Sequence, residues 1–233
     1  EPLPEHLKNL GEEIIKYGAD VGFAVDPDAD RLAIVNEMGE PLGEEYTLVV
    51  AADGYLRDTG REEKFVINLS TSLALEKLAE SNSSSVIRSA VGEINVVNKM
   101  IEINSKLGGE GNGGVILREC HLGRDSMVAA TMVLNRMSIS ESLISEIHAS
   151  LPQFEIVKDK IDIEGIDIED VIGRVSLLFE GAAIDKIDGI KFTWDDRWVH
   201  LRKSNTEPIM RIYAEAPDQD QALKLVNKIK SIL

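Results

Sequence analysis

Three aspartates at alternate positions are the residues in this chain whose spacing most clearly points to chemistry. Asp26, Asp28 and Asp30 separate two apolar runs: 21–25 predicts a short buried strand, and 32–35 predicts a second strand. Three carboxylates on one tight loop repel one another and raise one another's pKa. A hard cation with oxygen ligands, Mg²⁺ or Ca²⁺, would remove that penalty.

Arg31 follows the third aspartate, where its guanidinium could meet a phosphate that the metal also binds. Two other interpretations compete with this one: an ordinary aspartate turn, which stays open, and an EF-hand loop, which the sequence disfavours. Aspartate-rich turns also arise because Asp hydrogen-bonds its own backbone. An EF-hand loop would place Glu37 at its twelfth position, but it would put Arg31 where the turn needs glycine and would need helices on both sides.

The composition restricts the classes of partner. The chain has 233 residues, a net charge of −16 and 43% hydrophobic residues, and its pI is near 4.7. This charge argues against binding to nucleic acid or to an anionic membrane surface. The single cysteine, Cys120, excludes an intrachain disulfide and fits a reducing, cytoplasmic compartment. Because the chain starts without methionine, we expect a piece of a longer protein; its oligomeric state is left open.

Hydrophobic periodicity predicts alternating helices and strands up to Pro152, and therefore an α/β domain with a largely parallel sheet. The spacing of Ser138 to Glu141 predicts a capping box that starts a further helix. Expected helices cover 5–17, 44–58, 72–80, 93–103 and 125–137, and expected strands lie near 21–25, 32–35, 65–69, 86–87 and 115–117.

Beyond Pro152 the pattern changes to strands in antiparallel succession flanked by helices, which predicts a small α+β domain. The expected elements are a strand at 154–163, a helix at 167–178, strands near 189–194, 197–202 and 209–216, and a helix at 218–233.

Two more segments carry candidate binding groups. Residues 202–208, Arg-Lys-Ser-Asn-Thr-Glu-Pro, combine cations, hydroxyls and an amide in a turn, which suits a phosphate, although an ordinary polar turn stays open. Residues 108–114 hold five glycines around Glu110, which either allow close approach to a ligand or form a flexible surface loop. A strand follows this stretch, unlike a dinucleotide site, where a helix follows.

In their order, the three motifs resemble the α-D-phosphohexomutase superfamily, which includes phosphoglucomutase, phosphomannomutase and phosphoglucosamine mutase. Residues 26–31 resemble its metal loop, 109–114 occupy the place of its sugar-recognition loop, and 202–208 resemble its phosphate-binding loop. The helix start at Val91-Gly92, between the first two, also matches.

The resemblance implies a fold of class α/β in three parts. A partial α/β domain at 1–41 would be the C-terminal part of domain 2 with the metal loop. A mixed-sheet α/β domain at 42–152 would be domain 3, and a small α+β domain at 153–233 would be domain 4. It also implies that domain 1, with its phosphorylated serine, is absent, so that this chain alone would be inactive.

The implied activity is an isomerase that interconverts hexose 6-phosphate and hexose 1-phosphate through a phosphoserine and a hexose bisphosphate, with Mg²⁺ as cofactor. Arg31 would assist catalysis. The implied binding residues are Asp26, Asp28 and Asp30 for the metal, Glu110 and Asn112 for the sugar, and Arg202, Ser204, Asn205 and Thr206 for the phosphate.

The sequence departs from the family pattern in the sugar loop, which often reads Gly-Glu-x-Ser-Gly-His. Here Asn112 replaces the Ser and Gly114 replaces the His that helps to move protons. His121 and Arg124 are further candidates, although His121 also fits a plain polar residue at a strand end. Arg88 lies near a position, Ala90, where many relatives have Lys. Two further functions stay open: a non-catalytic sugar-phosphate-binding module, and a metal-dependent phosphatase with Asp26 as nucleophile.

Overall fold

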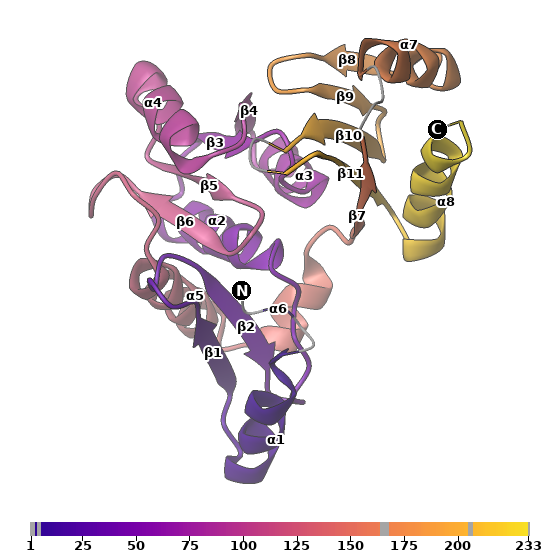
Figure 1. Ribbon diagram of the computed structural model, residues 1–233. Coiled ribbons are helices and arrows are strands. Elements are labelled where there is room, and N and C mark those ends of the chain that lie inside the picture. Colours follow the sequence, from indigo (N-terminus) through magenta and orange to yellow (C-terminus); the bar gives the residue numbers. More distant parts are fainter. Residues whose placement is uncertain (1–2, 4–5, 164–167, 205–206, 233) are drawn as a thin grey trace. The chain divides into compact units, whose positions relative to one another are not determined.

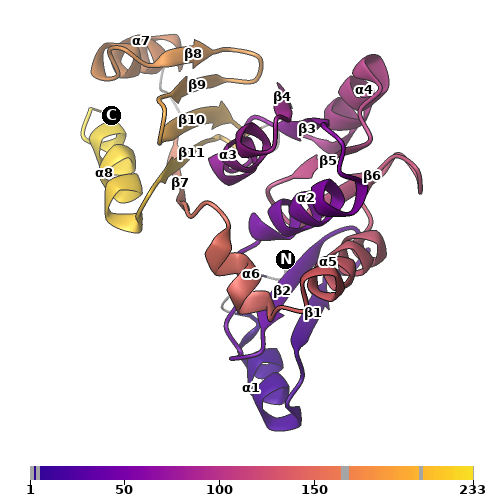
Figure 2. The ribbon, with the colours of Figure 1, turned by 180° about the vertical axis from the view of Figure 1, so that it is seen from behind.

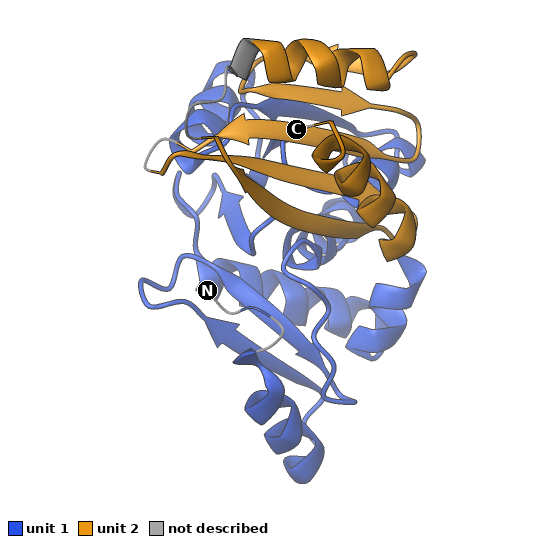
Figure 3. Cartoon of the chain, turned by 45° about the vertical axis from the view of Figure 1, so that its right-hand side comes forward, with its two compact units in different colours: residues 1–152 blue, residues 153–233 orange. Residues whose placement is uncertain are grey.

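The computed structural model describes residues 3, 6–163, 168–204 and 207–232, without the side chains of 168 and 169 (Figure 1). These residues form two compact units, 1–152 and 153–233 (Figure 3). The observed architecture confirms the predicted α/β class, with a mixed sheet in the first unit and an α+β arrangement in the second.

The first unit begins with a helix and a hairpin. Helix α1 (Lys8–Tyr17) ends at Gly18 in a left-handed conformation, and β1 (Val21–Val25) pairs antiparallel with β2 (Leu32–Asn36). Every residue of β2 is buried. The prediction that β1 is buried was wrong: β2 is its partner in a two-stranded sheet, and Val25 stays 50% exposed.

A four-stranded mixed sheet in the order β4-β3-β5-β6 forms the centre of this unit. Strand β3 is parallel to β4 and β5, whereas β5 and β6 form an antiparallel hairpin. The strands are β3 (Lys64–Asn68), β4 (Ser85–Ser89), β5 (Leu107–Glu110) and β6 (Gly114–Leu117).

Five helices of the same unit lie around the four-stranded sheet and the β1–β2 hairpin (Figures 1 and 2). On α4, Val96 and Met100 pack against Val66 and Ile116 of the sheet. Arg136 of α5 forms a buried ion pair with Asp53 of α2. The helices are α2 (Tyr46–Thr59), α3 (Leu73–Ser81), α4 (Glu93–Ile103), α5 (Ser126–Ser140) and α6 (Ile144–Ser150).

The capping box predicted at 138–141 was wrong, because α5 continues through Ser140. Glu141, in a left-handed conformation with φ of 52°, ends that helix instead. The next helix begins at Ile144, where the side chain of Glu146 accepts a hydrogen bond from Leu143 N at 3.0 Å. The Ser-x-x-Glu spacing at 138–141 therefore lies at the end of α5 and does not start the next helix.

The glycine-rich stretch is an ordered hairpin, so the flexible-loop alternative was wrong. The strand residues 107–110 and 114–116 are buried. A Cβ on Gly108 would lie 2.6 Å from the carbonyl oxygen of Val66, and one on Gly109 would lie 2.2 Å from that of Gly114. The glycines therefore allow close packing between strands.

The second unit is a five-stranded antiparallel sheet in the order β7-β11-β10-β9-β8 with two helices. Val175 of α7 and Val226 of α8 share one buried core with Phe192 and Ile212 of the sheet. Strand β8 was not predicted. The elements are β7 (Glu155–Asp162), α7 (Ile168–Leu178), β8 (Ala183–Asp185), β9 (Ile190–Thr193), β10 (Trp198–Lys203), β11 (Ile209–Ala216) and α8 (Gln219–Lys230), which Asp218 caps.

Gly113 connects the hairpin turn to β2, and we expect Gly113→Ala to lower the free energy of unfolding by about 2–4 kcal/mol. Its φ is +87°, and an added Cβ would lie 2.4 Å from the carbonyl oxygen of Leu32. Gly60→Ala is the matched control, because Gly60 has a φ of +60° but no atom within 4 Å of an added Cβ. Denaturant unfolding should give about 1 kcal/mol for the control; equal losses would contradict the packing argument.

Candidate metal and sugar site

The three aspartates come together on the turn between β1 and β2. One carboxylate oxygen from each lies within 4.8 Å of the others. Asp26 is buried, Asp30 is half-buried and Asp28 is exposed. The turn is shaped by a hydrogen bond from Ala29 N to Asp26 O at 3.0 Å, with Ala29 in a left-handed conformation at φ 58°. The loop therefore presents a cluster of hard oxygen donors of the kind that Mg²⁺ prefers.

Arg31 is engaged with this cluster. Its Nε donates to Asp26 Oδ2 at 2.7 Å, and the backbone N–H groups of Asp30 and Arg31 donate to Asp26 Oδ1 at 3.1 Å. The second pair of bonds is the local aspartate turn that the sequence left open, so the loop has this feature and the carboxylate cluster together. Both flanking elements are strands, which rules out an EF-hand; Glu37 instead accepts a hydrogen bond from the hydroxyl of Ser145.

The carboxyl groups of Asp26 and Asp30 have pKa values shifted in opposite directions. Burial acts to raise the pKa of Asp26, but the side-chain and backbone hydrogen bonds from Arg31 outweigh it and hold that pKa well below its usual range. Burial and the contact with Asp26 raise the pKa of Asp30, against the opposing charge of Arg124. The prediction of mutually raised pKa values therefore holds for Asp30 and was wrong for Asp26, whose charge Arg31 compensates.

Glu110 lies at the end of β5 and is buried, with 3% of its surface exposed. Its Oε1 accepts hydrogen bonds from Asn68 Nδ2 at 2.7 Å and from Gly92 N at 3.0 Å. Its Oε2 accepts one from Arg124 Nη1 at 2.7 Å. A carboxylate has about four acceptor positions, and donors among the described residues occupy three of those of Glu110, so its orientation is fixed.

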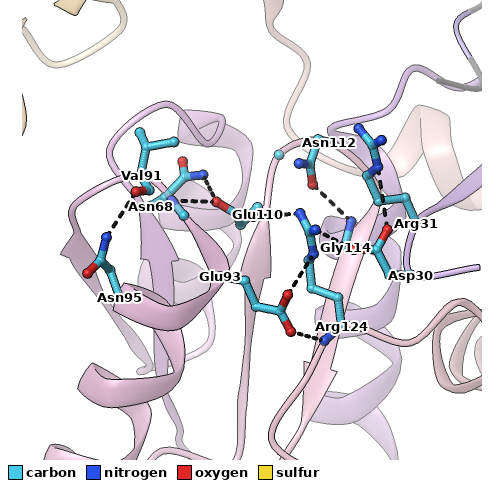
Figure 4. A network of polar contacts seen from close by, with 12 residues as sticks. Asp30, Arg31, Asn68, Val91, Glu93, Asn95, Glu110, Asn112, Gly114 and Arg124 are labelled. Carbon is cyan, nitrogen blue, oxygen red and sulfur yellow. Dashed lines mark hydrogen bonds and ion pairs between the residues drawn. The ribbon is translucent and has the colours of Figure 1, made fainter. Parts of the chain in front are cut away.

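Arg124 joins the aspartate loop to Glu110 (Figure 4). Its Nη2 donates to Asp30 Oδ2, while Nη1 donates to Glu110. Glu93, at the start of α4, accepts from Arg124 N at 2.9 Å and lies 3.6 Å from its Nε. One side chain thus connects the candidate metal loop and the candidate sugar residue, which are 80 positions apart in sequence.

The start of α5 also holds the aspartate loop. Ser126, its first residue, donates to the carbonyl oxygen of Ala29 from Oγ at 2.8 Å and from its backbone N at 3.3 Å. Asp125 caps the helix by accepting from Met127 N at 2.8 Å and Val128 N at 3.0 Å. The aspartate loop is therefore positioned by the start of α5, which is distant from it in the sequence.

The remaining candidates of this unit lie in different environments. Asn112 is in the hairpin turn, and its Oδ1 accepts from Gly114 N at 3.3 Å. His121 is exposed, and its Nε2 lies 3.7 Å from Oδ2 of Asp125, the residue that caps α5. Arg88 donates from Nη1 to three carbonyl oxygens of residues 68–71 and from Nε to Glu76 at 2.8 Å. These bonds fix the turn that follows β3.

Three residues of the site were missed from the sequence: Asn68, Thr71 and Glu93. Thr71 Oγ1 donates to Asn68 Oδ1 and accepts from Gly111 N, both at 3.0 Å, so it links the β3 turn to the hairpin. Asn68 is the last residue of β3, and the carboxyl ends of parallel strands are where ligands of α/β sheets bind. That rule could have pointed to Asn68.

The candidate phosphate segment belongs to the second unit. Arg202 lies in β10, at the end of the strand predicted at 197–202, and its Nε lies 3.4 Å from Asp188 Oδ2. Ser204 N donates to Ile209 O at 2.9 Å, which closes the β10–β11 pairing. Asn205 and Thr206 lie outside the described residues.

Sequence models of the phosphoglucomutase/phosphomannomutase family match almost the whole chain. Domain II matches residues 1–39, α/β/α domain III matches 43–154, and the C-terminal domain matches 154–232. The chain belongs to the α-D-phosphohexomutase superfamily.

Curated relatives of the family are longer than this chain. A phosphoglucomutase/phosphomannomutase of Thermococcus kodakarensis is 37% identical over 224 residues, covering 95% of this chain and 49% of that protein. A Pyrococcus abyssi protein named as a probable phosphoglucosamine mutase is 31% identical over 237 residues, covering 100% of this chain and 52% of that protein. The chain therefore spans about half the length of the curated relatives it matches.

Solved structures share the fold. A family protein from Burkholderia thailandensis has a TM-score of 0.81 at 20% identity, covering 98% of this chain and 49% of its own. Aspergillus fumigatus N-acetylphosphoglucosamine mutase, solved in complex with GlcNAc-6P and magnesium, has a TM-score of 0.63 at 15% identity, covering 89% and 47%.

Within the part of the chain that the structure describes, no helix is long and apolar enough to cross a bilayer.

Replacement of Asp26 should destabilise the protein even without a metal. In Asp26→Asn, an amide would face the donors of Arg31, and we expect a loss of about 1–3 kcal/mol in the free energy of unfolding. Asp28→Asn is the control: its side chain is exposed, and the change should stay within about 0.5 kcal/mol. Urea unfolding in the presence of a chelator gives both values. Equal stability of the two variants would contradict the structural role of Asp26.

Proposed function

We propose that this chain is part of a Mg²⁺-dependent phosphohexomutase that interconverts hexose 6-phosphates and hexose 1-phosphates through a phosphoserine and a hexose bisphosphate. The observation that carries the proposal is the bridge formed by Arg124 between Asp30 and Glu110. It brings a cluster of metal-binding oxygens and a buried, fixed carboxylate into one network, as a reaction on a sugar phosphate requires.

The residues of the aspartate loop fit a magnesium ion. The donor set consists of carboxylate oxygens, which Mg²⁺ prefers. Asp30 Oδ1 is buried, has no hydrogen-bond partner among the described residues and lies 3.5 Å from Arg31 Nε. A cation would satisfy this oxygen. The A. fumigatus relative was solved with magnesium, which supports the same metal here.

Asp26, Asp28 and Asp30 would hold Mg²⁺, which would supply positive charge to stabilise a transferring phosphoryl group. Arg31 assists electrostatically from beside the metal. Glu110 would accept a hydrogen bond from a sugar hydroxyl through its remaining acceptor position, and Asn112 lies in the adjacent hairpin turn.

The phosphate that does not react would bind at residues 202–206 of the second unit. The guanidinium of Arg202 and the hydroxyl of Ser204 suit a phosphate dianion. With net charge −16, long-range attraction does not favour an anion, so affinity must come from these local donors. The partners are therefore hexose phosphates and a hexose bisphosphate.

We also assign the three parts of the chain to domains of the intact enzyme: 1–41 to the end of domain 2, 42–152 to domain 3 and 153–233 to domain 4. The family matches at 1–39, 43–154 and 154–232 support these boundaries. The geometry does not favour the phosphatase alternative, because both carboxylate oxygens of Asp26 accept hydrogen bonds and the side chain is buried.

Asp28→Asn should weaken Mg²⁺ binding roughly tenfold or more, because it removes a charged oxygen ligand without changing the fold. Calorimetric titration of the wild type and the variant measures this directly. Asp58→Asn removes an equal charge from the exposed end of α2 and should leave the affinity unchanged. If Asp28→Asn binds Mg²⁺ as tightly as the wild type, the metal is not at this loop.

Arg202→Ala should abolish most of the binding of a hexose phosphate, which we expect to be weak, on the order of millimolar. An NMR titration with glucose 6-phosphate should shift the amides of 202–204 in the wild type. Arg197→Ala is the control, since Arg197 belongs to the same unit and pairs with its neighbour Asp196. Shifts that survive Arg202→Ala unchanged, or that occur only near Glu110, would place the phosphate elsewhere.

A further inference from the structure

Arg124 contacts carboxylates from three separate segments of the first unit. It donates to Asp30 on the β1–β2 turn and, at 2.7 Å, to Glu110 on β5. Its backbone N donates to Glu93 on α4 at 2.9 Å, and its Nε lies 3.6 Å from the same carboxylate. Its side chain is only 17% exposed, so these contacts are little screened by water.

The backbone is shaped to let Arg124 cross the site. An added Cβ on Gly114 would lie 2.3 Å from Arg124 Cδ, so a side chain at 114 would occupy the path of the arginine. The bond from Asp125 N to Val115 O at 3.0 Å holds the segment against β6. Glycine at 114, where the family loop often has histidine, therefore leaves room for the Arg124 side chain in this position.

Charge balance makes Arg124 important for the metal loop. Arg31 compensates Asp26 with a contact of 2.7 Å, but it lies 3.5 Å from Asp30. Asp30 and Glu110 have Arg124 as their close cation among the described residues. A divalent cation on Asp30 Oδ1, the oxygen without a hydrogen-bond partner among the described residues, would share the carboxylate charge with Arg124 at Oδ2 and would repel the guanidinium beside it.

We propose that Arg124 is a positioning residue that couples the metal loop to Glu110 by competing with the divalent cation for Asp30. Without metal it neutralises Asp30. With metal its contact with Asp30 weakens, and it is held by Glu110 and Glu93, which keeps Glu110 oriented for the sugar. This inference rests on the proposed function, which assigns the metal to the aspartates and the sugar to Glu110. Such a coupling is reciprocal, since each site changes the affinity of the other by the same factor.

The first test is calorimetric titration of Mg²⁺ into the full chain and its variants. Arg124→Gln should bind Mg²⁺ more tightly, by roughly five- to tenfold, because the competing cation is gone. A purely structural role predicts the opposite, since a disordered loop would bind less tightly. Arg124→Lys retains the charge and should stay within about twofold of the wild type.

Arg118→Gln is the matched control. Arg118 belongs to the same unit, and its Nη1 donates to the carbonyl oxygen of Met100 at 3.1 Å. This variant removes one positive charge from the unit and leaves the metal loop intact, so the Mg²⁺ affinity should not change. A gain equal to that of Arg124→Gln would show a general charge effect and would overturn the inference.

The second test uses the wild type alone, so it holds even if Arg124→Gln fails to fold. Saturation with Mg²⁺ should shift the NMR signals of Arg124 Nε–H and of the Gly92 amide, which donates to Glu110 at 3.0 Å. Shifts confined to residues 26–31 would overturn the inference.

The outcomes separate the inference from the function on which it rests. Mg²⁺ binding that Asp28→Asn weakens and Arg124→Gln leaves unchanged or weaker overturns the role of Arg124 and leaves the metal site in place. Failure of both wild type and Arg124→Gln to bind Mg²⁺ overturns the metal site, and the inference with it.

Discussion

Crowding of carboxylates is the constraint on which this site depends. Negative groups from the β1–β2 turn, β5 and α4 meet in a space where they would repel one another strongly. Two arginines compensate this negative charge. Arg31 pairs with Asp26 in the same turn, and Arg124, in the segment before α5, pairs with Asp30 and Glu110. Because Arg124 comes from a distant segment, the charge balance also fixes how the segments pack.

Close backbone packing makes this arrangement possible. Gly113 lets the hairpin turn approach β2, where Leu32 N donates to Gly113 O at 3.0 Å. Thr47 of α2 donates to the carbonyl oxygen of the same Leu32 at 2.7 Å, so that strand end is held from two directions. Ser126 holds Ala29 from a third side. The aspartate loop is therefore placed by residues that take no part in its chemistry.

The sequence predicted the order of most elements, because hydrophobic periodicity reflects which face of each element is buried. It also predicted that the carboxylates of Asp26, Asp28 and Asp30 cluster on one turn, because these residues lie close together along the chain. It did not predict the pairing of Arg124 with Asp30, 94 positions away, or of Asn68 with Glu110, 42 positions away. Such contacts depend on tertiary packing, which local patterns do not encode. The glycines of 108–114 were ambiguous for the same reason, because the neighbours that require them come from other segments.

Arg124 belongs to both the proposed metal site and the proposed sugar site. The most direct measurement is an anomalous diffraction map from a crystal of this protein grown with Mn²⁺, a close substitute for Mg²⁺. We expect one peak coordinated by oxygens of Asp26, Asp28 and Asp30, with the Arg124 guanidinium farther from Asp30 and still bonded to Glu110. A peak elsewhere, or a peak at the loop with the Arg124–Asp30 contact unchanged, would contradict this expectation.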